Sequence, residues 1–67
     1  MTTVTVERFK RGGSQKFYDS STFTTNTGVW DRQALEAETK NRIRTDGFNF
    51  TMEVSDGKGA WNKYLIY

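Results

Sequence analysis

The 67-residue chain carries ten Lys or Arg and eight Asp or Glu, for a net charge of +2, and it contains no Cys, His or Pro. A chain of this length forms one small domain, residues 1–67, and the missing Cys and His exclude disulfides, thiolate metal sites and histidine-based acid–base catalysis. Aromatic residues make up 15% of the sequence and can supply a core where aliphatic residues are scarce.

Residues 2–10 are predicted to form the first strand, because Val4 and Val6 alternate with polar residues. Phe9 falls on the other parity of this alternation. We therefore expect either a bulge near Glu7-Arg8 or a Phe9 side chain that faces away from the main core.

A turn at Gly12-Gly13-Ser14 is predicted to lead into a second strand at residues 16–25. The polar run Asp19-Ser20-Ser21 weakens the middle of this strand and indicates a bend there. The two strands together form an N-terminal hairpin.

Residues 31–46 are predicted to form the helix. Asp31 is a suitable N-cap, because its carboxylate can accept hydrogen bonds from the first backbone N–H groups. Trp30 and Leu35 have the spacing of a hydrophobic staple around that cap. At the other end, Gly47 can adopt the left-handed conformation that closes a helix. The helix carries one thin apolar stripe, which is enough to cover one face of a sheet.

Two further strands are predicted at residues 48–54 and 60–67, joined by a loop at 56–59. The first has one apolar face, formed by Phe48, Phe50, Met52 and Val54. The second is apolar on both faces, with Trp61, Leu65 and Tyr67 on one side and Tyr64 and Ile66 on the other. A strand that is apolar on both faces favours a central place in the sheet.

The predicted fold class is α+β, with the order ββαββ and a single helix packed on one face of a four-stranded sheet. Two arrangements remain open: a β-grasp-like sheet, in which the terminal strands pair in parallel at the centre, and a wholly antiparallel sheet. In element order and length the chain resembles the β-grasp immunoglobulin-binding domains of protein G, but it shares no motif with them, so the resemblance implies no function. We expect the uncovered sheet face to carry aromatic and apolar side chains drawn from Phe9, Tyr18, Tyr64 and Ile66.

No constellation of residues marks a catalytic site, and we predict that the protein is not an enzyme and binds no metal or cofactor. The glycines at residues 12–13 and 56–59 lack the full spacing of a nucleotide-binding loop and are explained by turns. The carboxylates fit helix ends, ion pairs and turns.

The whole excess of positive charge lies in residues 1–28, which carry four basic and two acidic residues. The four basic residues are interleaved with aromatic ones, a composition suited either to a protein interface or to single-stranded nucleic acid. The simpler interpretation is that the charges keep an exposed hairpin edge soluble, while the aromatic side chains belong to the core. A second basic cluster at residues 40–44 is explained by the helix dipole. The predicted partner-binding residues are Arg8, Phe9, Lys10, Arg11, Lys16, Tyr18 and Tyr64.

We therefore predict a non-enzymatic binding module, a small inhibitor that sterically blocks a functional surface of a partner protein, such as a nucleic-acid-handling host protein. In style, though not in any motif, such a domain resembles small phage-encoded inhibitors of host machinery, anti-CRISPR proteins among them. The alternatives are a small single-stranded nucleic-acid-binding protein and a structural subunit of a larger assembly, and a homodimer is also open. The chain has neither a secretory signal nor an apolar run that could span a membrane, so we expect a cytoplasmic protein, in the host cytoplasm if it is phage-encoded.

Overall fold

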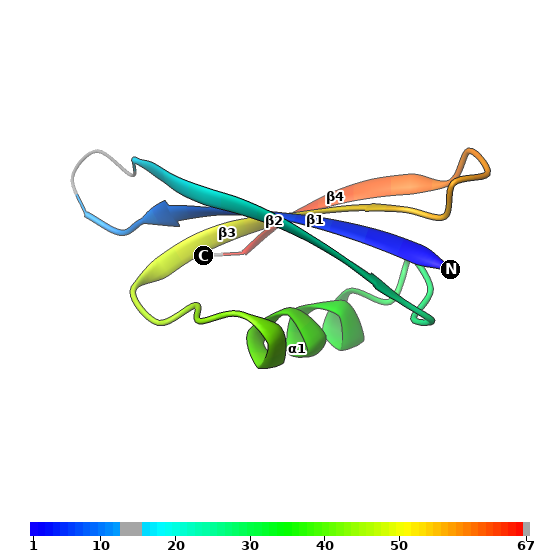
Figure 1. The fold of residues 1–67 in the computed structure, drawn as a ribbon, viewed down its shortest axis with the longest axis horizontal. Helices are drawn as coiled ribbons and strands as arrows, with labels where there is room; N and C mark the ends of the chain where they lie inside the picture. The colour runs from blue at the N-terminus through cyan, green and yellow to red at the C-terminus, as the bar shows by residue number, and fades with distance from the viewer. Residues whose placement is uncertain (13–15, 67) are drawn as a thin grey trace.

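A computed structural model describes residues 1–12 and 16–66 and contains one helix and a four-stranded sheet (Figure 1). The elements are β1 (Thr2–Lys10), β2 (Phe17–Thr25), α1 (Arg32–Arg42), β3 (Phe48–Ser55) and β4 (Trp61–Ile66). The sheet order is β2-β1-β3-β4, and all neighbouring strands are antiparallel. This confirms the α+β class and the wholly antiparallel arrangement. The predicted turn at Gly13-Ser14 and the predicted strand end at Tyr67 lie outside the described residues.

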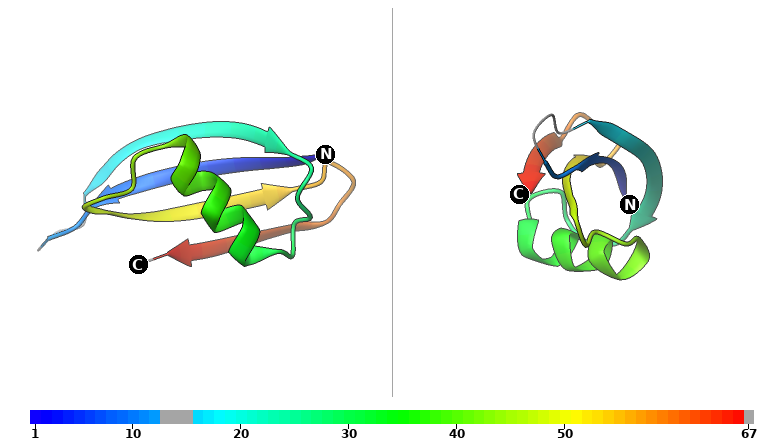
Figure 2. Two further views of the ribbon diagram at one scale, coloured as in Figure 1. Left: turned by 90° about the horizontal axis from the view of Figure 1, so that it is seen from below. Right: turned by 90° about the vertical axis from the view of Figure 1, so that its left-hand side faces the viewer.

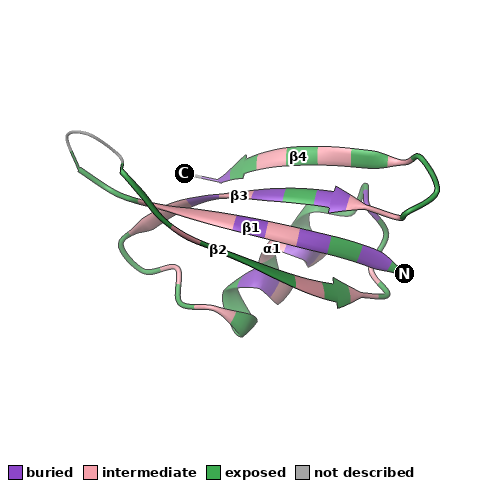
Figure 3. Cartoon of the chain, turned by 45° about the horizontal axis from the view of Figure 1, so that its top comes forward, coloured by how far each residue is buried: buried purple, intermediate pink, exposed green. Residues whose placement is uncertain are grey.

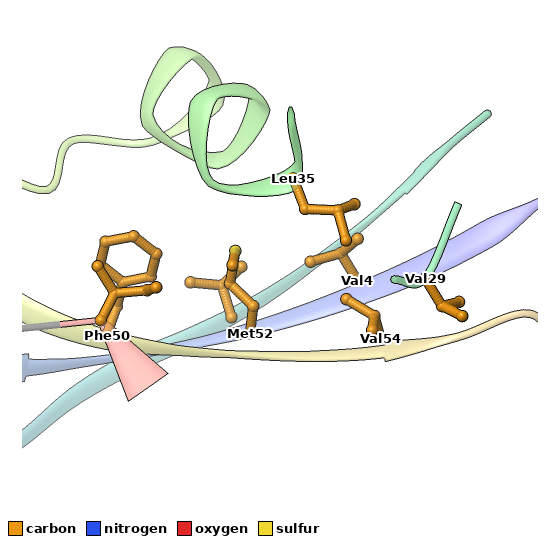
Figure 4. Close-up of a cluster of buried hydrophobic side chains, with 8 residues drawn as sticks. Val4, Val29, Leu35, Phe50, Met52 and Val54 are labelled. Carbon is orange, nitrogen blue, oxygen red and sulfur yellow. The ribbon is translucent and has the colours of Figure 1, made fainter. Parts of the chain in front are cut away.

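The helix crosses one face of the sheet diagonally, from beside β4 to beside β2 (Figure 2). The register places Val4 of β1 opposite Val54 of β3, and Val6 opposite Met52, so one face of the two central strands is apolar. Leu35 of α1 fills the space above these residues and is fully buried (Figure 4). The hydrophobic core consists of Val4, Val6, Val29, Leu35, Phe50, Met52, Val54 and Ile66.

The helix begins as predicted but is not stapled as predicted. The Asp31 carboxylate accepts a hydrogen bond from the backbone N–H of Ala34 at 3.3 Å, which confirms the N-cap. Trp30, however, leaves 68% of its surface exposed, so the predicted staple with Leu35 is wrong. The neighbouring Val29 is buried in its place.

The helix ends earlier than predicted, at Arg42 instead of residue 46. Ile43 is extended, with φ −135° and ψ 155°, and its partly buried side chain packs against the core. Gly47 does have a positive φ, at +80°, but it lies in the turn before β3, where the Phe48 N–H donates to the carbonyl of Thr45. The chain leaves the helix early because it must travel along the sheet to the start of β3.

The central position that was favoured for β4 is wrong, because β4 pairs only with β3 and forms an edge. Its helix-side face does contribute to the core, through Ile66 and the partly buried Tyr64. Its other face is left uncovered, so that Trp61 is 62% exposed and Leu65 52% exposed. Figure 3 shows buried residues alternating along the central β1 and β3, a largely exposed β2, and a β4 that alternates between exposed and intermediate residues.

The strand irregularity near Phe9 lies in β2 and not in β1. Arg8 lies opposite Asp19 and Phe9 opposite Phe17, so Tyr18 is an extra residue in β2. The pairing of β1 with β3 continues without a shift, and Phe9 therefore faces away from the core, as one of the two predicted options had it. The expectation that Tyr18, Tyr64 and Ile66 would join it on the uncovered face is wrong, since all three lie on the helix side.

Candidate interaction surface at the hairpin end

An aromatic pair lies where β2 begins, and positive charges flank it. Tyr18 of β2 and Phe48 of β3 pack with their ring centres 4.7 Å apart. The guanidinium carbon of Arg8 lies 5.1 Å from the centre of the Tyr18 ring and 4.9 Å from that of Phe48. The ammonium of Lys10 lies 5.5 Å from the Tyr18 ring centre. Each cation is within the distance at which the electron-rich ring face attracts it.

Arg8 is held in place by partners on two elements. Its Nε donates to Oδ1 of Asp19 at 2.7 Å, a second N–H donates to the other Asp19 oxygen, and Nη1 donates to the carbonyl of Arg44 at 2.7 Å. The hydrogen bond from Arg8 holds the pKa of the Asp19 carboxyl below its ordinary value, and the same bond raises the pKa of Arg8. Arg8 therefore fixes β2 and the loop after α1 around the aromatic pair and is not a free contact for a partner.

The fold brings the loop after α1 next to the end of the hairpin. The N–H of Arg11 donates to the carbonyl of Gly47 at 3.2 Å, and Arg8 binds the carbonyl of Arg44 as described. The backbone of Arg44 thus lies beside the basic residues of the hairpin, whereas the sequence indicated only an interaction of this residue with the helix dipole. Arg42 lies elsewhere, with its guanidinium carbon 4.5 Å from the Phe23 ring centre on β2.

The fold therefore separates the members of the basic cluster at residues 40–44: the Arg44 carbonyl lies at the hairpin, whereas Arg42 lies on Phe23.

A cavity of about 270 Å³ lies beside this cluster, between the last turn of α1, the following loop and the sheet. Phe48 is shared between the cavity and the aromatic pair. The lining residues are Arg11, Lys40, Thr45, Asp46, Gly47, Phe48, Phe50 and Ile66.

Six of the seven predicted partner-binding residues lie at this end of the molecule, but on both faces of the sheet. We call this region the hairpin end, and it comprises Arg8, Phe9, Lys10, Arg11, Lys16, Phe17, Tyr18 and Phe48. Phe9 packs edge-on against Phe17 on the uncovered face, with ring centres 5.8 Å apart. Lys10, Arg11 and Lys16 are exposed.

Tyr64, the seventh predicted residue, does not join them. Its hydroxyl donates to the carbonyl of Val29 at 3.0 Å, and the guanidinium carbon of Arg32 lies 5.9 Å from its ring centre. Tyr64 therefore ties β4 to the segment before α1. Sequence reasoning also missed Phe48, whose place in a regular apolar alternation gave no sign that its ring would support Tyr18.

Two negative findings concern the described residues. Within residues 1–12 and 16–66, no helix has the length and apolar character that a membrane span requires. In the same part of the chain, no three acidic side chains gather into a group that could hold a metal ion.

The chain matches no protein-family model, no curated protein and no solved structure. Its function must therefore be argued from its own geometry.

Proposed function

We propose that the protein is a non-enzymatic binding module that docks on a partner protein through the hairpin end. The observation that carries this proposal is the exposure of large rings among cations, with Phe17 57% exposed and Tyr18 49% exposed. Aromatic and arginine side chains are enriched among the residues that dominate binding energy at protein interfaces. The bonds of Arg8 to Asp19 and to the Arg44 carbonyl hold Tyr18 in place, which lowers the entropy lost on binding.

The mechanism that fits this surface is steric. Because Phe17 and Tyr18 lie on opposite faces of the sheet, the partner would straddle the hairpin end and contact one ring on each face, while Lys10, Arg11 and Lys16 would face acidic groups around it. A module of this kind blocks whatever else uses that surface. Inhibition of a host protein in the cytoplasm, in the manner of small phage-encoded inhibitors, remains part of the proposal.

Single-stranded nucleic acid is the second candidate, and the Tyr18–Phe48 pair with Lys10 beside it is the observation that favours it. A base could stack on the exposed Tyr18 ring while the ammonium contacts a phosphate. The candidate ranks second because the net charge of the chain is only +2 and because Arg8 is already paired with Asp19.

One capture experiment with a matched control tests the proposal. The immobilised protein is exposed to lysate of the cells in which it acts, together with the variants Phe17→Ser, Lys16→Glu and Trp61→Ser. Trp61 is as exposed as Phe17 but lies on β4, far along the sheet from the hairpin end. We expect one protein to be captured by the wild type and by Trp61→Ser, and to be lost with the other two variants.

The same preparation is tested against a fluorescent thymidine oligonucleotide at about 50 and 200 mM salt. Tight binding that weakens steeply with salt, together with no captured protein, would replace the protein-partner proposal with the nucleic-acid one. Capture that survives Phe17→Ser and Lys16→Glu would show that the hairpin end is not the docking surface.

A further inference from the structure

The chain contains two Asp-Gly steps, Asp46-Gly47 and Asp56-Gly57, and their hydrogen bonds differ. In such a step the side-chain carboxyl can approach the next backbone nitrogen closely, because glycine has no Cβ to keep it away. That nitrogen can then attack the carboxyl carbon and close a succinimide ring. The hydrogen bonds of the carboxyl and of the glycine N–H decide how readily the two groups meet.

The carboxyl group of Asp56 is held away from this reaction. Its Oδ1 accepts hydrogen bonds from the backbone N–H groups of Lys58 at 2.7 Å and Ala60 at 3.1 Å. The N–H of Gly57 donates to Oγ of Ser55 at 3.1 Å, so the attacking group is engaged as well. Ring closure at this step requires these bonds to break, and each lost bond raises the barrier.

The reacting groups of Asp46 and Gly47 are not engaged in this way. Both residues are exposed and lie in a turn that the Phe48 N–H closes by donating to the carbonyl of Thr45 at 3.0 Å. Gly47 is tied to the hairpin through its carbonyl, which accepts from the Arg11 N–H. Among the described residues, neither the Asp46 carboxyl nor the Gly47 N–H has a hydrogen-bond partner. A Cβ added at Gly47 would meet no atom within 4 Å, so the space around it is open for the carboxyl to turn.

We propose that Asp46-Gly47 is a modification site at which the aspartate converts spontaneously to isoaspartate, whereas Asp56-Gly57 is protected. The Gly47 nitrogen forms a bond to Cγ of the protonated Asp46 carboxyl, and the carboxyl hydroxyl leaves with the amide hydrogen as water. Water then opens the ring. Its addition at Cγ restores aspartate, while its addition at the backbone carbonyl breaks the original peptide bond and leaves Gly47 joined through Cγ, which is isoaspartate. These steps consume no oxidant or reductant and take back the water that they release.

The modification changes the contact between this turn and the hairpin end. Isoaspartate adds one methylene to the backbone before Gly47, so the Gly47 carbonyl loses its position against the Arg11 N–H. The turn bond between Phe48 and Thr45 spans the same segment and is disturbed too. Because the Phe48 ring packs on Tyr18, the change reaches the surface described above. The reaction itself needs no partner, so this inference goes beyond the proposed function and does not depend on it.

The test is to incubate the folded protein for several weeks at neutral and at mildly acidic pH and to locate isoaspartate by mass spectrometry. Cleavage after Glu53 separates the two steps, and electron-transfer fragmentation distinguishes isoaspartate from aspartate, which has the same mass. We expect isoaspartate at residue 46 to form at least about tenfold faster than at residue 56, because the Asp56 carboxyl must first lose its two bonds. The reaction should be faster at mildly acidic pH, since the carboxyl reacts in its protonated form.

A matched pair of variants and an unfolded control separate the effect of structure from that of sequence. Asp46→Glu and Asp56→Glu each keep the charge but require a larger ring, which closes far more slowly. Labelling by isoaspartyl methyltransferase should therefore be nearly lost in Asp46→Glu and unchanged in Asp56→Glu. In guanidinium chloride, where neither step keeps its hydrogen bonds, the two rates in the wild type should become similar.

Two results would overturn the inference. One is an equal rate at the two steps in the folded protein. The other is a folded protein that forms no isoaspartate at residue 46 while the unfolded chain does. Amide hydrogen exchange checks the structural consequence: exchange at Arg11 should be faster in the converted protein than in fresh protein, and equal exchange would show that the bond to Gly47 survives.

Discussion

Replacing Leu35 with Ala is expected to destabilise the protein strongly, because this side chain carries the packing of the helix on the sheet. Leu35 is fully buried, and among the described apolar residues of α1 no other reaches that burial. It lies above the Val4–Val54 pair of the two central strands (Figure 4). Removing it leaves a cavity between the two layers of the fold.

The expected loss can be set against a matched control. A buried Leu→Ala change costs about 2–5 kcal/mol, and a domain of this length has a total stability of about 3–10 kcal/mol. Leu65→Ala is the same chemical change at a side chain that is 52% exposed on β4. There the loss should be at most about 1.5 kcal/mol, half the value of full burial, and no internal cavity forms.

Urea denaturation followed by far-ultraviolet circular dichroism measures both variants. Tryptophan emission is a poor probe here, because Trp30 and Trp61 are largely exposed in the folded protein. With a denaturant slope of about 1 kcal/mol/M, the midpoint for Leu35→Ala should lie about 0.5–5 M below that for Leu65→Ala. Equal midpoints for the two variants would refute the packing of α1 described above.

Two further predictions concern the hairpin end and the loop beside it. Arg8 lowers the pKa of Asp19 in the folded protein, so their pair stabilises the fold above the ordinary Asp pKa of 3.8, and this contribution is lost as the pH falls through the lowered pKa. The urea midpoint of Asp19→Asn should therefore fall less steeply in acid than that of the wild type. Parallel pH profiles of the two proteins would contradict the pairing. Gly47→Ala should cost about 1–2 kcal/mol, because its φ is +80°, whereas Gly28→Ala, at a position with open space and no positive φ, should change the urea midpoint little.

Local features of the fold could be predicted because their signals lie within a few residues of one another. The alternation from Phe48 to Val54 and the cap at Asp31 each depend on neighbours in the sequence, and both are present in the structure. The end of the helix was misplaced because Gly47 has the conformation of a helix terminator but serves a later turn. Local sequence does not show which of these two roles a glycine takes.

The arrangement of the sheet and the candidate site depend on contacts between distant residues. The two apolar faces of β4 suggested a central strand, yet Trp61 simply remains exposed at an edge. Tyr18 changes sides because of an extra residue in β2, which the sequence indicated only as a bend nearby. The cavity brings Arg11 and Lys40 together through the loop after α1, and no spacing in the sequence reveals that meeting.

The central place of β1 has a consequence for how the chain folds during synthesis. β1 can pair with β2 as soon as that strand is made, but its other neighbour runs from Phe48 to Ser55. At roughly 5–20 residues per second, β1 waits on the order of seconds with one edge unpaired and its valines uncovered. Contacts between such distant segments also slow folding itself. Until β3 is made, the nascent N-terminal hairpin therefore presents an unpaired strand edge to which another chain could add.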